Sequence, residues 1–167
     1  MIRPGDPLPS VPVKLITAEG VSDATSTEVL GTGKVVFFAV PGAFTPTCDT
    51  SHLPGFVAGA DRITAMGVSR IVCGSVNDHH VMKAWAERSD ALGKVDFLAD
   101  PSAEFAKALG LDKDFPALGG TRFARFAMIV NDGIVQDLFV QDEAGVTVSG
   151  APAIIIALEG QGQRISA

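Results

Sequence analysis

The chain has 167 residues, of which 47% are hydrophobic and 19% are charged. This length and composition predict one domain, residues 1–167, with a packed core. The net charge of -6 argues against binding to nucleic acid or to an anionic membrane surface. No apolar stretch approaches the roughly 20 residues that a transmembrane helix needs. Four prolines interrupt the first twelve residues, which is unlike a secretory signal, so we expect a cytoplasmic protein.

The first part of the chain predicts two strands and a long helix. Residues Val11–Thr17 alternate between apolar and polar, which is typical of a half-exposed strand near a sheet edge. Residues Lys34–Val40 are continuously apolar and rich in β-branched and aromatic side chains, as in a central strand covered on both faces. Thr45 followed by proline matches an N-cap and first helical residue. We expect this helix to run to about Met66, with a kink near Pro54.

The strand and helix alternation then continues for two more pairs of elements. They are the strand Ser69–Val76, a helix capped by Asn77 or Asp78 that ends near Ala91, the strand Val95–Asp100, and a helix that starts at Asp100-Pro101 and ends at Gly110. Alternation of this kind favours an α/β layered fold.

The last third of the chain has a different pattern. Two strand-like runs, RFAMIVND and GIVQDLFV, meet at Asp132-Gly133, a strong signal for a tight antiparallel hairpin. Residues Phe115–Gly120 are typical of a loop, and Pro152–Leu158 of a short helix. The order of elements predicts a thioredoxin-like α/β fold, with a central mixed β-sheet flanked by helices on both faces.

Cys48 occupies the N3 position of the helix that we expect to start at Thr45. Backbone N–H groups without helical partners and the positive end of the helix dipole both favour the thiolate there, so Cys48 is a candidate nucleophile. Thr45 lies three residues earlier on the same face, where its hydroxyl can reach the sulfur. Pro41 lacks an N–H and can shield the sulfur from water.

The segment PGAFTPTCDTSHLPGF contains Pro41, Thr45 and Cys48 in the spacing P-x-x-x-T-x-x-C. It resembles the active-site signature of the peroxiredoxins, in particular the peroxiredoxin-5 or type II subfamily. The similarity continues through VCGSVND, RFARFAMIVNDG and GVTVSGAP. The resemblance implies a thiol-dependent peroxidase with a thioredoxin fold, usually a homodimer, that reduces hydrogen peroxide, organic hydroperoxides and often peroxynitrite without a metal or other cofactor.

By the same resemblance, Arg125 matches the catalytic arginine that stabilises the thiolate and aligns the peroxide. Arg122 also precedes the strand and is the rival candidate, ranked second. The expected reaction is attack of the Cys48 thiolate on the terminal peroxide oxygen, which gives a sulfenic acid and water or an alcohol. We expect Thr45, Arg125 and the Cys48 amide to donate hydrogen bonds to the developing charge.

The sequence departs from some peroxiredoxins in how the sulfenic acid is reduced. Where those relatives carry a second cysteine near the C-terminus, this chain has Val148. The other cysteine, Cys73, lies in a strand that we expect to be buried, and we interpret it as a structural thiol of the core. We therefore favour a one-cysteine cycle with glutathione/glutaredoxin as reductant, with thioredoxin as the open alternative. Asp49 replaces the serine common in relatives, and we expect it to point to solvent.

The same residues allow an alternative function and two further roles for histidines. A non-enzymatic peroxide sensor that signals through oxidised Cys48 is the alternative function, and repeated turnover distinguishes an enzyme from a sensor. His52 lies four residues after Cys48, but a stabilised thiolate needs no base, so we expect it to pack or hydrogen-bond within the helix. His79 and His80 are adjacent on a helix and point in different directions, which argues against a metal site.

Overall fold

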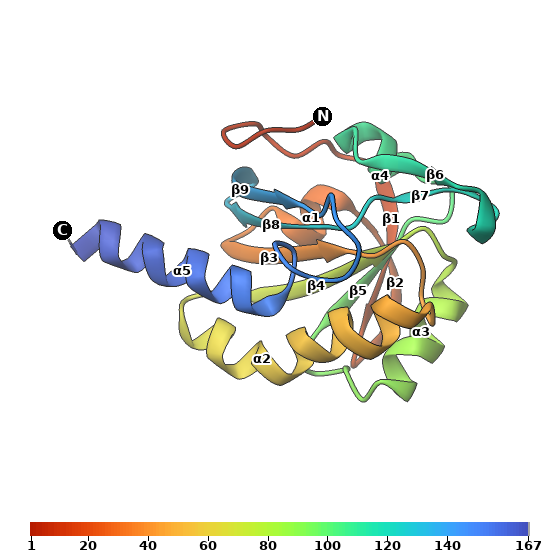
Figure 1. Cartoon of the computed structure of the whole chain (residues 1–167), viewed down its shortest axis with the longest axis horizontal. Helices are drawn as coiled ribbons and strands as arrows, with labels where there is room; N and C mark the ends of the chain where they lie inside the picture. Colours follow the sequence, from red (N-terminus) through yellow and green to blue (C-terminus); the bar gives the residue numbers. More distant parts are fainter. Residues whose placement is uncertain (167) are drawn as a thin grey trace.

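The computed structural model describes the backbone of residues 1–166 and the side chains of residues 1–161. Its main sheet has seven strands. They are β1 (Pro12–Thr17), β2 (Gly20–Thr25), β3 (Lys34–Ala39), β4 (Arg70–Ser75), β5 (Asp96–Ala99), β8 (Phe126–Asn131) and β9 (Ile134–Val140). The strand order is β2-β1-β5-β4-β3-β8-β9, with β3, β4 and β5 parallel and the other pairs antiparallel (Figure 1). The predicted mixed sheet is confirmed.

Helices cover both faces of this sheet (Figure 1). On one face, α2 (Leu53–Ala65), α3 (His79–Arg88) and α5 (Ala151–Ser166) bury their apolar side chains in a core cluster that contains Val36 and Phe38 of β3. On the other, α1 (Ser26–Leu30) and α4 (Glu104–Leu109) pack in a second cluster that contains Val35 and Phe37. Successive side chains of a strand point to opposite faces, so β3 contributes to both clusters.

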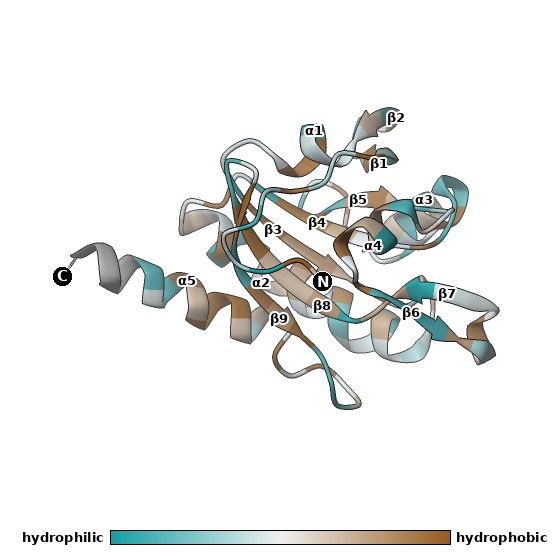
Figure 2. Ribbon diagram, turned by 90° about the horizontal axis from the view of Figure 1, so that it is seen from above, coloured by the Kyte–Doolittle hydropathy of each residue, from teal (hydrophilic) through white to brown (hydrophobic). Residues whose placement is uncertain are grey.

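The strand β3 is central, as its composition predicts. It pairs in parallel with β4 on one side and antiparallel with β8 on the other. Five of its six residues are buried, and Figure 2 shows the hydrophobic strands gathered in the middle of the sheet. A strand covered on both faces needs apolar side chains at every position, which explains the uninterrupted run in the sequence.

The strand β1 lies near the edge of the sheet, as predicted, but the edge itself is formed by β2, a strand that was not predicted. The predicted loop Phe115–Gly120 contains η2 (Pro116–Leu118) and connects two strands that were also not predicted: β6 (Asp112–Phe115) and β7 (Gly120–Phe123) form a separate two-stranded ribbon. Three of the six residues of β2 and three of the four of β6 are exposed and none is buried, so neither strand has the apolar alternation that marks a strand in the sequence.

The predicted helix ends agree with the structure at some positions and differ at others. Asp78 caps α3 by accepting a hydrogen bond from the Val81 N–H at 3.0 Å, as predicted. The prediction that a helix starts at Asp100-Pro101 was wrong, because α4 begins at Glu104. The Asp100 carboxylate nevertheless accepts hydrogen bonds from the first turn, from the N–H groups of Phe105 and Ala106 at 3.1 and 3.0 Å. Asp100 therefore satisfies N–H groups of the first helical turn although it lies four residues before the helix begins.

The C-terminal part contains the predicted hairpin and a longer helix than expected. Asp132 and Gly133 join β8 to β9 with φ angles of 48° and 82°, the left-handed pair that a type I′ turn requires. The helix α5 extends over 16 residues, well beyond the predicted Pro152–Leu158. Among the residues described, no helix has the length and hydropathy required to span a membrane.

Candidate active site

The helix that carries Cys48 begins with an irregular turn. Helical geometry starts at Pro46, as predicted, and continues through the π-helical turn η1 (Cys48–His52) into α2. In this turn the Leu53 N–H donates to the Cys48 carbonyl, five residues back. The irregularity lies just before Pro54, whose ring would clash with the Thr50 carbonyl in a regular α-helix. The wider turn avoids that clash, and such single π-turns recur at functional sites.

Cys48 is fully buried, and its sulfur contacts a charged group from a distant part of the chain. The Arg125 Nη2 donates a hydrogen bond to Cys48 Sγ at 3.1 Å. Arg125 lies between β7 and β8, so the turn between these strands aims the guanidinium at the first turn of the Cys48 helix. The guanidinium is permanently charged and only donates hydrogen bonds, so it is placed to stabilise negative charge that develops at the sulfur.

Arg122, the rival arginine, has a different set of contacts. Its Nη2 donates to the Leu118 carbonyl at 2.8 Å, and its Nη1 donates to the Pro41 carbonyl at 3.4 Å. These bonds tie the β6–β7 ribbon to the loop that precedes Cys48. The structure thus places Arg125 against the sulfur, whereas Arg122 contacts backbone carbonyls.

Thr45 and Pro41 lie in the loop between β3 and the Cys48 helix. Pro41 is buried and Thr45 is half-buried. The Thr45 hydroxyl donates to the Gly42 carbonyl at 2.7 Å. A hydroxyl has a single proton. Because Thr45 donates that proton to the Gly42 carbonyl, its oxygen can only accept further hydrogen bonds. The loop turns sharply at Phe44, which has a φ of 64°, a strained value for a non-glycine residue.

His52 connects Arg125 to the loop that precedes α5. Arg125 Nη1 lies 2.8 Å from His52 Nδ1, and His52 Nε2 lies 2.8 Å from the Ser149 carbonyl oxygen. Because a guanidinium only donates, Nδ1 accepts, and the imidazole proton is on Nε2 and is donated to Ser149. Burial lowers the pKa of His52 to about 4, and the nearby Arg125 charge acts in the same direction against the Ser149 hydrogen bond.

From the sequence, His52 was expected only to pack or hydrogen-bond within its helix, so this connection to Arg125 was missed. The available signal was its spacing of four residues from Cys48, which places both side chains on the same side of the helix. The imidazole also packs against the Phe38 ring, with 5.0 Å between the centroids.

Comparison with known proteins identifies the family of this site. The profile of the redoxin family matches residues 3–155. Peroxiredoxin-2B of Arabidopsis thaliana is 40% identical over 159 residues, which cover 94% of this chain and 98% of that protein. The crystal structure of reduced Prx3 of Vibrio vulnificus in complex with hydrogen peroxide is 43% identical, with a TM-score of 0.91 over 97% of this chain and 99% of that one.

The chain belongs to the peroxiredoxin family. It has the thioredoxin-like fold of these proteins and is a thiol-dependent peroxidase, an enzyme that reduces peroxides with electrons from thiols. The structure of peroxiredoxin 5 from Alvinella pompejana is also similar, with 28% identity and a TM-score of 0.83 over 96% of this chain and 99% of that one. The resemblance stated from the motif is confirmed.

The second cysteine of this peroxiredoxin lies in the core. Cys73 is on β4, is fully buried, and is in register with Phe38 of β3 and Phe97 of β5. Burial raises the pKa of the Cys73 thiol well above its ordinary value, and the proximity of Cys48 raises it further. A protonated, inaccessible thiol is a poor nucleophile. The expected burial of Cys73 is confirmed.

Asp49 does not point to solvent, so that expectation was wrong. Only 17% of its side chain is exposed. The carboxylate accepts a hydrogen bond from Trp85 Nε1 at 2.9 Å and lies 3.3 Å from Arg88 Nη2. Both partners belong to α3, so Asp49 attaches the Cys48 turn to that helix. Its negative charge is directed toward α3 and is paired there.

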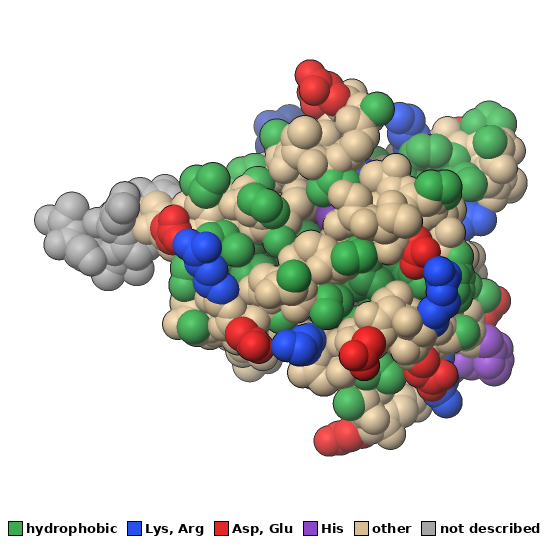
Figure 3. Space-filling model, turned by 60° about the horizontal axis from the view of Figure 1, so that its bottom comes forward, with side chains coloured by type: hydrophobic (Ala, Val, Ile, Leu, Met, Phe, Trp, Pro, Cys, Tyr) green, Lys and Arg blue, Asp and Glu red, His purple; other side chains and the backbone are tan. Residues whose placement is uncertain are grey.

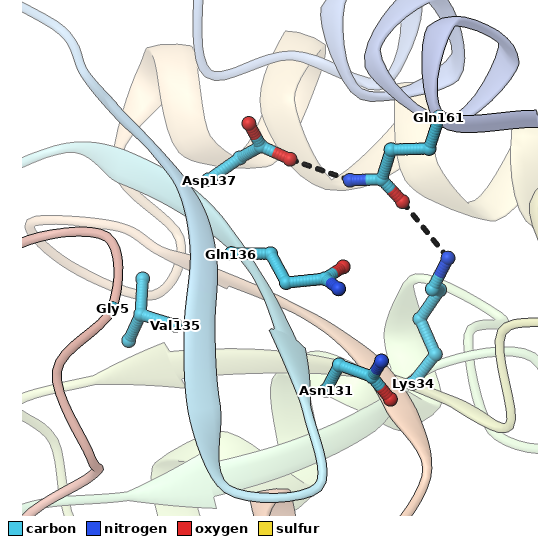
Figure 4. A pocket seen from close by; sticks show the side chains of 7 residues that line it. All are labelled: Gly5, Lys34, Asn131, Val135, Gln136, Asp137 and Gln161. Carbon is cyan, nitrogen blue, oxygen red and sulfur yellow. Dashed lines mark hydrogen bonds between the residues drawn. The ribbon is translucent and has the colours of Figure 1, made fainter. Parts of the chain in front are cut away.

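One pocket of the protein is built mainly from polar side chains far from Cys48. It has a volume of about 490 Å³ and lies at the opposite end of β3 from Cys48 (Figure 4). There Lys34 donates to Gln161, and Gln161 donates to Asp137, so the polar groups pair with one another. Within the described residues, no three His, Cys, Asp or Glu side chains lie close enough to hold a metal ion.

The neutral state of His52 makes a testable contribution to stability. Because the folded protein keeps His52 unprotonated down to a pKa of about 4, whereas an unfolded histidine titrates near 6.5, the free energy of unfolding should fall as the pH is lowered between these values. The shift corresponds to about 3 kcal/mol. Denaturant unfolding across this pH range should show a smaller decrease in His52→Leu than in the wild type.

The comparison with His52→Leu is needed because other groups titrate in the same window. Burial raises the pKa values of Asp96 and Asp100, so these carboxyls bind protons more readily in the folded state and stabilise it as the pH falls. They are present in both proteins and cancel in the difference. An identical pH dependence in the two proteins would show that His52 is protonated as easily in the folded chain as in the unfolded one.

Proposed function

We propose that Cys48 is the nucleophile of the peroxidase reaction and that Arg125, Thr45 and Pro41 form its catalytic surroundings. The supporting observation is the 3.1 Å contact between Arg125 Nη2 and the fully buried Cys48 Sγ. The thiolate is the form of cysteine that attacks an oxygen electrophile, and a fixed positive charge beside the sulfur is suited to stabilise it.

In the proposed reaction, the Cys48 thiolate attacks the terminal oxygen of hydrogen peroxide or an organic hydroperoxide. The S–O bond forms as the O–O bond breaks, Cys48 becomes a sulfenic acid, and the other oxygen leaves as water or an alcohol after taking up a proton. Negative charge moves from the sulfur to the leaving oxygen. Arg125 and the Cys48 amide stabilise this charge. The hydrogen peroxide named in the Vibrio vulnificus Prx3 complex supports peroxide as the substrate.

We propose a role for Thr45 that differs from the donor role expected from sequence. Its proton is donated to Gly42, so its oxygen is an acceptor for a peroxide O–H group rather than a donor to it. Accepting that hydrogen bond orients the peroxide while the Arg125 guanidinium donates to it. Pro41 contributes no N–H and excludes water from the buried side of the sulfur.

We further propose a one-cysteine cycle in which an external thiol reduces the sulfenic acid. Cys73 is buried within β4, and Val148 replaces a second cysteine in the C-terminal loop. Attack of glutathione sulfur on the sulfenic acid forms a mixed disulfide and releases water, and glutaredoxin then exchanges this disulfide. Thioredoxin is the alternative reductant.

The decisive experiment follows peroxide consumption by the purified protein with each reductant in turn. The glutathione and glutaredoxin system, with its reductase and NADPH, should sustain many equivalents of peroxide per chain, and a thioredoxin system serves as the second arm. A peroxide sensor would stop after one equivalent in both arms. Consumption of a single equivalent with both systems would contradict the proposed enzyme cycle.

We also propose that residues 1–167 act as one domain, in the cytoplasm, as a homodimer. Two free cysteines suit a reducing compartment, and fusion to a fluorescent protein tests the location.

The surface supports the proposed homodimer. Hydrophobic side chains lie among charged ones on the face shown in Figure 3. Phe44 is 39% exposed beside the Cys48 turn, with the Arg88 guanidinium 5.4 Å from its ring centroid. Sedimentation equilibrium should give twice the chain mass of 17.3 kDa.

A further inference from the structure

The loop between β9 and α5 reaches the active site through one backbone carbonyl. Ser149 is fully buried, and its carbonyl oxygen lies 2.8 Å from His52 Nε2. On its other ring nitrogen, His52 accepts the hydrogen bond from Arg125 Nη1, whose neighbouring Nη2 contacts Cys48. The position of Ser149 is therefore linked to the position of the guanidinium at the reactive sulfur.

A single side chain, Gln141, holds this loop in place. Its Oε1 accepts hydrogen bonds from the Thr147 N–H at 2.9 Å, the Ser149 hydroxyl at 3.0 Å and the Ser149 N–H at 3.4 Å. Its Nε2 donates to the Thr147 hydroxyl at 2.7 Å and to the Glu143 carbonyl at 3.3 Å. The Gln141 backbone N–H donates to the carbonyl of Arg125 itself, at 2.9 Å.

The loop has few other anchors. Residues 142–145 and 147–148 are exposed, and in the described part of the chain no side chain other than Gln141 hydrogen-bonds to residues 142–148. Val146 is half-buried, but a segment that is otherwise exposed opens easily unless hydrogen bonds hold it. The Gln141 amide thus supplies the main restraint on the segment that leads to Ser149.

We propose that Gln141 is a positioning residue for the peroxidase reaction: its amide fixes the Ser149 carbonyl, which holds His52 in the tautomer that accepts from Arg125 and keeps Arg125 on Cys48. The inference rests on the role proposed above for Arg125. Gln141 itself contacts neither the sulfur nor the guanidinium and acts through His52.

The tautomer of His52 explains how the Ser149 carbonyl affects the orientation of the Arg125 guanidinium. The Ser149 carbonyl requires a proton on Nε2, which leaves Nδ1 unprotonated to accept from Arg125. If the carbonyl moves away, the buried Nε2–H loses its partner, and the alternative tautomer becomes accessible. That tautomer places a proton on Nδ1, directed at an Arg125 N–H group, so two donors face each other and the guanidinium loses its fixed orientation.

The test compares Gln141→Met with Gln141→Glu and with Gln136→Met, which changes an exposed glutamine on β9, the strand that ends just before Gln141. The main measurement is the rate at which hydrogen peroxide oxidises Cys48 in a single turnover, followed by fluorescence. Trp85 is the only tryptophan, and its indole N–H donates a hydrogen bond to Asp49, the residue after Cys48. Its emission therefore reports on the turn that carries Cys48. A second measurement is the ultraviolet absorbance of the thiolate at neutral pH.

We expect Gln141→Met to oxidise about 10-fold more slowly and to show a smaller thiolate absorbance, the effect of weakening one charge-assisted hydrogen bond. Gln141→Glu retains acceptors for Thr147 and Ser149 and should recover most of the rate. Gln136→Met should match the wild type. A purely structural role would lower only the thermal midpoint of Gln141→Met, with rate and absorbance unchanged in the folded protein, and would overturn the proposal.

A double-mutant cycle with His52→Leu tests whether Gln141 acts through His52. The double variant should be no slower than His52→Leu alone, because the acceptor that Gln141 positions is already absent. Multiplied losses would show independent effects and overturn the proposed route. If the wild type itself failed to reduce peroxide, the proposed function would fall, whereas an active wild type with an unaffected Gln141→Met would remove only the positioning role.

Discussion

Replacing Cys48 by serine should reduce peroxidase activity by more than about 1,000-fold. A serine hydroxyl is not ionised at neutral pH even beside Arg125, so the 3.1 Å contact that polarises the sulfur cannot generate an equivalent nucleophile. The measurement is peroxide consumption at saturating reductant, together with the single-turnover fluorescence of Trp85. Neither signal should exceed the background of a reaction without protein.

The matched control for this prediction is Cys73→Ala, because both cysteines are free and fully buried. Cys73 is surrounded by core side chains, and its raised pKa keeps it protonated, so its removal should leave the rate within about twofold of the wild type. The loss of a buried sulfur should lower stability by about 1 kcal/mol. Equal loss of activity in both variants would instead assign Cys73 to the reduction step and contradict the one-cysteine cycle.

Replacing Arg125 by methionine should slow the oxidation of Cys48 by about 100- to 1,000-fold, the usual effect of removing one donor from a developing anion. Methionine keeps much of the side-chain volume but provides neither the bond to Cys48 nor the bond to His52. Arg125→Lys should also be impaired, since a single ammonium lacks the planar fork that reaches both partners. The second-order rate constant with hydrogen peroxide is the measured quantity.

Arg122→Met is the control for Arg125→Met. Arg122 donates to the carbonyls of Leu118 and Pro41 and does not contact the sulfur, so its loss should reduce the rate by less than about 10-fold, through a looser loop at Pro41. The thiolate absorbance should fall in Arg125→Met and stay near the wild-type value in Arg122→Met. The opposite ranking of the two variants would exchange the roles assigned to these arginines.

Local patterns in the sequence were sufficient to predict the central strands of the fold. The strand β3 was recognisable because a strand buried on both faces needs an uninterrupted apolar run. The β8–β9 hairpin was recognisable because Asp132-Gly133 suits two consecutive left-handed residues. The strand β2 and the β6–β7 ribbon were missed, since exposed strands held by backbone bonds leave little trace in hydropathy.

For the active site, the sequence by itself was sufficient to propose Cys48 as the nucleophile. Thr45, Pro46 and Cys48 are close in the chain, and the start of a helix places Cys48 in the first turn whatever surrounds it. Only the tertiary structure decided what surrounds the sulfur: Arg125 is 77 residues away in sequence and Ser149 is 97 residues from His52. Contacts between such distant residues depend on how the strands and loops pack, so periodicity and capping, which act over a few residues, carry no information about them.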